Sequence, residues 1–216
     1  MFDILKEDIS CILERDAAAK SKAEVVFLYP GFKAIRSHRI AHRLYKRGHF
    51  FCARMLSQRI AKKYGIEIHP GAEIGRRCFI DHGNGVVIGE TTQIGDDVTI
   101  YQGCTLGGTG KDKGKRHPTI GNNVMVGAGA RVLGPFKVGD NAKIAAGAVV
   151  LSEVPEGCTA VGVPARIARV YGRKSGLQDL DQIHIPDPIS QKFCLLDKEI
   201  EKLKKSLEEV KTNADL

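Results

Sequence analysis

An aliphatic residue returns at every sixth position through the middle of the chain, and this period constrains the fold more than any other feature. A period of six matches neither the about 3.6 residues of a helical turn nor the two-residue alternation of an isolated strand. It is typical of a parallel β-helix built from hexapeptide repeats. The thirteen positions, with two breaks in the count, are Ile68, Ile74, Ile80, Ile88, Ile94, Ile100, Leu106, Ile120, Val126, Val132, Val138, Ile144 and Val150.

A second row of mostly small residues lies two positions before the aliphatic row. Side chains at i and i−2 of a strand point to the same side, so we predict that both rows line the interior. Glycine often follows the aliphatic residue, where we expect the backbone to turn. The second row is Ala72, Cys78, Val86, Thr92, Val98, Cys104, Val124, Ala130, Ala142 and Ala148, with Phe136 as the large exception, and the glycines are Gly75, Gly89, Gly95, Gly107, Gly121, Gly127 and Gly139.

The sequence therefore predicts a mainly β protein, a left-handed parallel β-helix over residues 66–170. Residues 1–65 are predicted to form an N-terminal helical region, with helices over 2–15, 32–46 and 50–63. Residues 171–216 are predicted to form a linker and a C-terminal amphipathic helix. That helix either joins a homotrimer or packs on its own subunit, and its apolar residues, spaced by three and four, are Phe193, Leu196, Ile200, Leu203, Leu207 and Val210.

Composition narrows the class of protein and its compartment. Hydrophobic residues make up 43% of the chain and charged residues 27%, as in a globular domain. No apolar run reaches the about 20 residues that cross a bilayer, and residues 1–16 do not resemble a signal peptide, so we expect a cytoplasmic protein without membrane attachment. The six cysteines form no C-x-x-C pair, which argues against a zinc knuckle. Cys78 and Cys104 belong to the small interior row and are interpreted as packing residues, and we expect no disulfide framework.

Basic residues are concentrated between positions 31 and 65, where ten lysines and arginines occur without an acid. A basic stretch of this kind belongs to a nucleic-acid-binding surface, to a solvated helix face or to a positive field that attracts an anionic small molecule. No aromatic residues alternate with the basic ones and no nucleic-acid-binding motif is present, so the sequence favours the helix face and no nucleic-acid partner.

The first break in the repeats carries a histidine, in the run Asp81-His82-Gly83. Aliphatic rows fill the interior of a coil, so a side chain that leaves the wall must act on the outer surface, where a neighbouring subunit can meet it. Glu67 lies about one coil earlier. A carboxylate that accepts a hydrogen bond from one ring nitrogen fixes the tautomer and raises the basicity of the other. His82 and Glu67 are thus a candidate general-base dyad, and the alternative is an ordinary surface histidine.

The second break combines a glycine-rich run, 107–110, with a basic loop that ends in Arg116 and His117. Glycines leave backbone N–H groups open to a ligand oxygen. An arginine offers two parallel hydrogen bonds to a carboxylate. Lys111, Lys113 and Lys115 either attract phosphates or are simply solvated. The remaining histidines, which we interpret as structural, are His38, His42, His49, His69 and His184.

Together these motifs, which span about residues 16–166, resemble the serine O-acetyltransferase family. The resemblance implies acetyl transfer from the co-substrate acetyl-CoA to the hydroxyl of L-serine without a metal, and inhibition by L-cysteine. The runs that carry it are His69 to Gly75, Asp81 to Gly83, Gly107 to Gly110, Arg116 to Pro118 and Gly162 to Arg166.

The same resemblance implies a role for each matching residue. It makes His82 the catalytic base, paired with Glu67 where many members have aspartate. It places Asp16 and Asp81 in contact with serine, and Arg116 against the serine carboxylate. His117 becomes a second histidine at the serine site, with a catalytic or substrate-binding role. The residues that would line the groove for CoA are Gly108, Ala128, Ala146 and Gly147, with Arg166 as a phosphate contact.

Assembly and acceptor leave alternatives open. The helical region is shorter than in longer members of the family, so we predict a homotrimer, with a hexamer as the alternative. Docking into O-acetylserine sulfhydrylase uses a tail ending in isoleucine, whereas this chain ends in Leu216. Three alternative functions also stay open. Related hexapeptide acetyltransferases act on sugars or other hydroxyl and amine acceptors, and trimeric β-helix carbonic anhydrases bind zinc through three histidines. The third alternative is a non-catalytic assembly protein.

Overall fold

The computed structural model describes residues 2–110, 113–168, 193, 196–204 and 206. Contacts divide the chain into two compact units, Met1–Ile185 and Pro186–Leu216. The predicted helical region and β-helix fall together in the first unit, and the predicted boundary at residue 170 lies outside the described residues. In the second unit, residues 193, 196–204 and 206 are helical, within the predicted amphipathic helix.

Four helices precede the repeats, and they are α1 (Phe2–Arg15), α2 (Lys22–Leu28), α3 (Pro30–Lys46) and α4 (Phe50–Tyr64). The Ser21 hydroxyl accepts the Glu24 N–H at the start of α2, and Pro30 occupies the first turn of α3, where its missing N–H costs nothing. Gly65 ends α4 in the left-handed conformation. The predictions for α1, α3 and α4 are confirmed within two residues, whereas α2, with seven residues, went unpredicted because it is too short to show a period.

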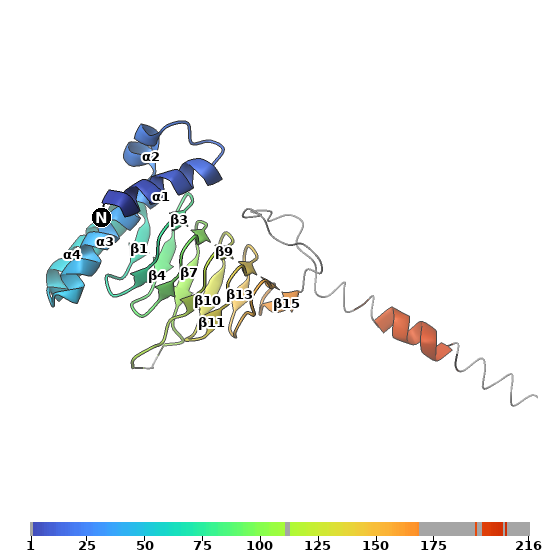
Figure 1. Cartoon of the computed structure of the whole chain (residues 1–216). Helices are drawn as coiled ribbons and strands as arrows, with labels where there is room; N and C mark the ends of the chain where they lie inside the picture. Colours follow the sequence, from blue (N-terminus) through green and yellow to red (C-terminus); the bar gives the residue numbers. More distant parts are fainter. Residues whose placement is uncertain (1, 111–112, 169–192, 194–195, 205, 207–216) are drawn as a thin grey trace, which may run out of the picture. The chain divides into compact units, whose positions relative to one another are not determined.

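The repeats form three sheets that the chain visits in turn, as in a triangular β-helix (Figure 1). Pairing is parallel throughout except between β14 and β15. Sheet A contains β1 (Ile66–Ile68), β4 (Val86–Ile88), β7 (Thr105–Gly107), β10 (Arg131–Leu133) and β13 (Val149–Val150). Sheet B contains β2 (Glu73–Ile74), β5 (Gln93–Ile94), β8 (Thr119–Ile120) and β11 (Lys137–Val138). Sheet C contains β3 (Phe79–Ile80), β6 (Thr99–Ile100), β9 (Met125–Val126), β12 (Lys143–Ile144), β14 (Thr159–Val161) and β15 (Arg166–Ala168).

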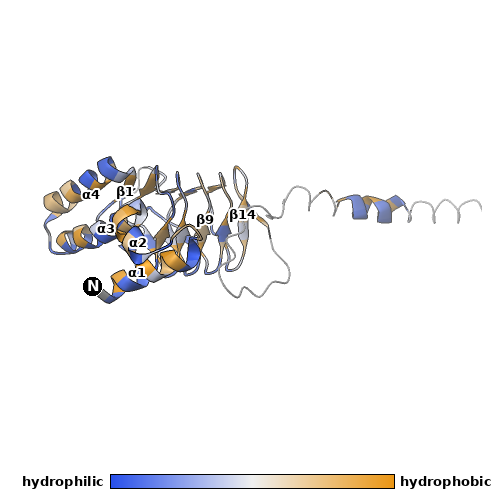
Figure 2. Cartoon of the chain, turned by 90° about the horizontal axis from the view of Figure 1, so that it is seen from above, coloured by the Kyte–Doolittle hydropathy of each residue, from blue (hydrophilic) through white to orange (hydrophobic). Residues whose placement is uncertain are grey.

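The interior is built from the two predicted rows. Of the thirteen periodic aliphatic residues, all but Ile74 are buried, and Ile74 packs against the core while partly exposed. The small row is buried as well, apart from the partly buried Phe136. Both predictions about the interior are therefore confirmed. The N-terminal helices carry hydrophilic and hydrophobic residues side by side, as amphipathic helices do (Figure 2).

The glycines that follow the aliphatic row have a different cause from the one expected. Their φ angles are not left-handed, so these positions do not turn the chain in a way that requires glycine. Coils instead approach too closely for a side chain, since a Cβ on Gly127 would lie 2.6 Å from the backbone nitrogen of Ala146. The left-handed turns fall two residues later at Gly129, and elsewhere at the non-glycine residues Arg77, Asp97, Asn123 and Asn141. The explanation from turning was wrong, and close stacking replaces it.

Ion pairs and hydrogen bonds join α1 to α3 and to the β-helix, where α1 lies beside β3 (Figure 1). Asp8 on α1 accepts hydrogen bonds from Arg39 of α3 at 2.9 Å and from the backbone N–H of Arg77 at 3.0 Å. Arg15 donates to Asp97 at 2.7 Å. These contacts fix the end of α1, and with it Asp16. Within the described residues, no helix is both long and apolar enough to span a membrane.

Candidate active site at two corners of the β-helix

The predicted site residues gather at two corners of the triangle. We call the turn from sheet C to sheet A the CA corner and the turn from sheet A to sheet B the AB corner. His82 follows β3 and therefore lies at the CA corner, whereas Arg116 and His117 follow β7 and precede β8 at the AB corner. The strands of sheet A run between the two corners.

His82 is presented openly at the CA corner. Its backbone is left-handed, with φ of 55°, a conformation that few non-glycine residues adopt and that is often found at functional sites. Its side chain is 74% exposed, and its Nε2 atom lies 3.9 Å from the Asp81 carboxylate. Gly83 lets the chain pass close to the core, because a Cβ there would lie 2.5 Å from Cδ1 of Ile66. The local fold thus turns the imidazole outward.

Two carboxylates lie near this turn: Asp81 is next to the His82 ring, and Asp16 is close enough to Asp81 to influence its pKa. Asp16 is held at both oxygens, since Oδ1 accepts the Ala18 N–H at 2.8 Å and Oδ2 accepts the Tyr29 hydroxyl at 2.6 Å. Burial raises the pKa of Asp81, and the nearby Asp16 raises it further, against an opposing contribution from His82. Two neighbouring carboxylates repel each other when both are ionised, and a cation bound between them would relieve this repulsion. The sequence placed Asp16 here by resemblance, but nothing in its pattern pointed to Tyr29.

Small residues continue the CA corner away from His82 on successive coils. Backbone hydrogen bonds of 2.8 Å each join Gly103 N–H to Asn84 O, Gly129 N–H to Gln102 O and Gly147 N–H to Ala128 O. The predicted groove residues at this corner are therefore stacked in one column with the His82 turn, and Ala146 and Gly147 are exposed. Of the other residues predicted to bind CoA, Arg166 is exposed on β15, whereas Gly108 lies at the AB corner.

At the AB corner, Arg116 is held by acidic and aromatic neighbours. Its guanidinium group forms an ion pair with Glu90, and the Tyr45 hydroxyl of α3 donates to the other Glu90 oxygen at 2.8 Å. The Tyr45 bond and Arg116 both lower the pKa of Glu90. A Cβ on Gly108 would lie 3.0 Å from the Arg116 carbonyl oxygen, so the glycine lets the loop close. Sequence reasoning missed Glu90 and Tyr45, because neither belongs to a break or a recognised motif.

His117 is enclosed at the same corner. It is 8% exposed, and its Nδ1 atom lies 2.9 Å from the Thr91 hydroxyl oxygen. Burial lowers its pKa, and the positive charge of Arg116 lowers it further. Lys115 donates to the Thr91 carbonyl oxygen at 2.8 Å and so closes the loop over β5. Burial lowers the pKa of His69, which the sequence suggested was structural, and the nearby Arg116 and His117 contribute to the lowering.

The structure does not bring all of the predicted residues together. Glu67 lies on β1, where it accepts a hydrogen bond from Gln58 of α4 at 3.3 Å. Among the described residues, Glu67 and His82 share no hydrogen bond or ion pair, so the dyad stays a prediction. No contact joins the Asp16, Asp81 and His82 group to Arg116 and His117 within the described part of the chain either.

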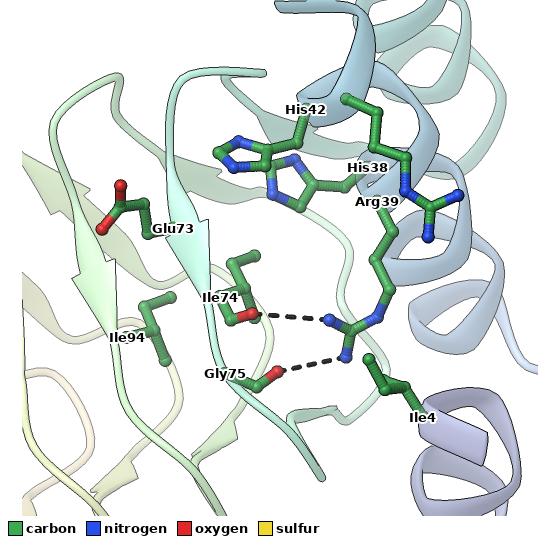
Figure 3. A pocket seen from close by; sticks show the side chains of 9 residues that line it. Ile4, His38, Arg39, His42, Glu73, Ile74, Gly75 and Ile94 are labelled. Atoms are coloured by element: carbon green, nitrogen blue, oxygen red, sulfur yellow. Dashed lines mark hydrogen bonds between the residues drawn. The ribbon is translucent and has the colours of Figure 1, made fainter. Parts of the chain in front are cut away.

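A separate cavity of about 490 Å³ lies between α3 and strands β2 and β5 (Figure 3). Its walls include His38 and His42, and Arg39 crosses it to donate to the carbonyl oxygens of Ile74 and Gly75. Burial lowers the pKa of His38 to about 3, so this histidine is neutral in the folded protein. Of the described residues that line the cavity, none is a predicted site residue. Across the described ranges, no three His, Cys, Asp or Glu side chains converge to hold a metal.

Known proteins share both the sequence and the fold. The profile of the family "Bacterial transferase hexapeptide (six repeats)" matches residues 117–152. A serine acetyltransferase of Bacillus licheniformis is 55% identical over 207 residues, which cover 95% of each protein. A solved serine acetyltransferase in complex with cysteine has a TM-score of 0.81 and 44% identity, over 85% of this chain and 71% of that one. A serine acetyltransferase from Brucella abortus in complex with coenzyme A has a TM-score of 0.77 and 46% identity, over 79% and 68%.

These findings confirm the resemblance that the motifs suggested. Identity of 55% across nearly the full length of both proteins is far more than a shared β-helix requires. The chain therefore belongs to the serine acetyltransferase family.

Proposed function

We propose that this protein transfers the acetyl group of acetyl-CoA to the side-chain hydroxyl of L-serine, giving O-acetyl-L-serine and CoA. The observation that carries the reaction is the 55% identity with a serine acetyltransferase over 95% of both chains. Solved relatives with coenzyme A and with cysteine support acetyl-CoA as the co-substrate and L-cysteine as an inhibitor that takes the place of serine.

We assign the site to two subunits of a homotrimer. Three residues of a sheet A strand at about 3.3 Å each put roughly 10 Å between the CA and AB corners. The ammonium and carboxylate groups of an amino acid share one carbon, so the groups that bind them must lie much closer together. One subunit would supply Asp16, Asp81 and His82, and its neighbour would supply Arg116 and His117.

His82 acts as the base in this mechanism. A serine hydroxyl is a poor nucleophile near neutral pH, so a positioned group must take its proton as the oxygen attacks the thioester carbonyl. The exposed imidazole is free to meet that hydroxyl. When the carbon–sulfur bond breaks, His82 returns the proton to the sulfur of CoA. Glu67 remains the predicted partner for the other ring nitrogen.

The remaining residues hold the two substrates. Asp16 and Asp81 bind the ammonium group, and Arg116 binds the carboxylate with two parallel hydrogen bonds. The backbone N–H near Gly108 stabilises the oxyanion, a contact worth about 3 kcal/mol in other enzymes. CoA lies along the column of small residues at the CA corner, namely Ala128, Ala146 and Gly147, with Arg166 against a phosphate.

The reaction is tested by the release of free CoA thiol from acetyl-CoA, with L-serine or an amino sugar as acceptor. We expect release that depends on serine and that added L-cysteine suppresses. Release with the amino sugar alone would leave the fold and His82 in place but contradict the roles of Asp16, Asp81 and Arg116.

The two-subunit site has its own test. Chains carrying His82→Ala and chains carrying Arg116→Ala, each of which we expect to be strongly impaired when serine is kept below its KM, are co-expressed in equal amounts and assayed at that serine concentration. A site between subunits regains both groups in about a quarter of the random pairings. Activity that stays at the level of the single variants would place both groups in one subunit. The cytoplasmic location and the docking into O-acetylserine sulfhydrylase stay predictions, and the C-terminal end lies outside the described residues.

A further inference from the structure

We infer that Thr91 is a positioning residue that holds the His117 ring as the neutral tautomer with its proton on Nε2. His117 then serves the reaction as a hydrogen-bond donor to the serine carboxylate and not as a second base. The ring's tautomer follows from hydrogen bonds within the chain, whereas the acceptor in serine rests on the proposed function.

The Thr91 hydroxyl has a single direction left for its hydrogen. Its oxygen accepts the backbone N–H of Arg116 at 3.1 Å and the backbone N–H of His117 at 3.1 Å. A hydroxyl has two acceptor lone pairs and one hydrogen. With both lone pairs engaged, the hydrogen points to the third neighbour, the His117 Nδ1 atom at 2.9 Å.

The Nδ1 atom receives a second donor from the same residue. The backbone N–H of Thr91 points at Nδ1 with a distance of 3.1 Å. A ring nitrogen that faces two donors is an acceptor and carries no hydrogen, so a neutral imidazole must place its proton on Nε2.

Packing opposes rotation of the His117 ring, and its surroundings oppose the binding of a second proton. The imidazole lies against Gly89, where a Cβ would collide with both Cδ2 and Nε2 of His117. The charges around it are Arg116 and Lys115, which oppose an imidazolium, and Glu90, which favours one. Burial adds to the opposition, and the net effect is a lowered pKa.

Nε2–H is thus a fixed donor that needs an acceptor. Among the described residues, no hydrogen-bond acceptor contacts Nε2. The positive charge of Arg116 acts on the His117 ring, so the inference places a carboxylate bound to that guanidinium group within reach of both donors. A neutral donor beside an arginine adds direction to carboxylate binding without repelling the arginine.

The tautomer can be measured without any activity. In the full-length protein labelled with 15N-histidine, a His117→Gln variant identifies the His117 signals. We expect an unprotonated Nδ1 and a protonated Nε2 at pH 7 in the wild type. A proton on Nδ1, or an imidazolium at that pH, would overturn the inference.

Three variants then connect the tautomer to serine. Thr91→Val should raise the KM for serine about 10-fold, the effect of about 1.4 kcal/mol, while kcat and the KM for acetyl-CoA change little. Thr91→Ser keeps the hydroxyl and should restore both the Nε2–H signal and the KM. The matched control is Thr92→Val, because the buried Thr92 hydroxyl has no partner among the described residues and its loss should leave the KM unchanged.

The outcomes separate this inference from the proposed function. An unchanged serine KM in Thr91→Val, with the tautomer intact, would remove Thr91 from its role. If Thr91→Val does not fold, the wild-type spectrum and Thr91→Ser still decide. A protein with the expected tautomer but without serine-dependent thiol release would contradict the proposed function alone.

Discussion

The CA and AB corners each interrupt the hexapeptide count with a histidine, yet they treat that histidine in opposite ways. His82 is 74% exposed at its side chain, whereas His117 is 8% exposed and hydrogen-bonded at Nδ1. A group that accepts and returns a proton must reach its substrate, while a group that only orients a substrate is best held rigid. The difference supports the proposed division, in which the chemistry takes place at the first corner and the second corner recognises the substrate.

Charge separates the corners as well. Asp16 and Asp81 make the CA corner acidic, and the pKa of Asp81 is raised by its burial and, to a smaller extent, by Asp16. Among the described residues of the AB corner, Arg116 and Lys115 lie near the carboxylate of Glu90, whose pKa is lowered by hydrogen bonds from Tyr45 and Arg116. An amino acid has one group of each sign, so two unlike corners suit it better than two similar ones.

The largest expected effect is at the exposed histidine. His82→Ala should lower kcat by about 100-fold or more, because the loss of a general base has this size. The melting temperature should hardly change, since the side chain is exposed. The matched control is His49→Ala, an exposed histidine outside both corners. Thiol release near the wild-type rate in His82→Ala would remove the chemistry from the CA corner.

A middle-sized effect is expected at the AB corner. Arg116→Lys keeps the positive charge but loses the planar guanidinium group. This group pairs with Glu90 and, in the proposed site, binds the serine carboxylate. We expect the KM for serine to rise about 10-fold, as for the loss of one charged hydrogen bond, with kcat changed much less. Steady-state kinetics at varied serine measure this. A fall in kcat with an unchanged KM would mean that the AB corner takes part in the chemistry.

The smallest effect concerns stability at the CA corner. The pKa of Asp81 in the folded protein lies above its usual 3.8, so the native state binds more protons than the unfolded state just above that pH. Stability then falls as the pH rises through this window. Asp81→Asn should raise the melting temperature by about 1 to 3 °C at pH 7, and the gain should vanish below about pH 3.5, where both proteins are uncharged at this position. A lower melting temperature at pH 7 would show that the Asp81 carboxylate stabilises the fold.

Much of the fold could be predicted because its cause is local and repeated. Each coil presents an aliphatic residue and a small residue at fixed positions, so burial of Ile100 or Val126 follows from the count of six. Two features could not be predicted in this way. Ile74 on sheet B is only partly buried, and α2 is too short to show a helical period. The glycine row was predicted with the wrong reason, since stacking between coils cannot be seen from one coil.

The β-helix, the breaks at His82 and His117, and the family could all be predicted from the chain, because they depend on short spacings and on local motifs. The folded protein was needed to show that the breaks occupy different corners, that Tyr29 holds Asp16 and that Thr91 holds His117. The physical reason is that a hydrogen bond needs a separation of about 3 Å and a direction. Residues far apart in the chain meet these conditions only after the coils have stacked.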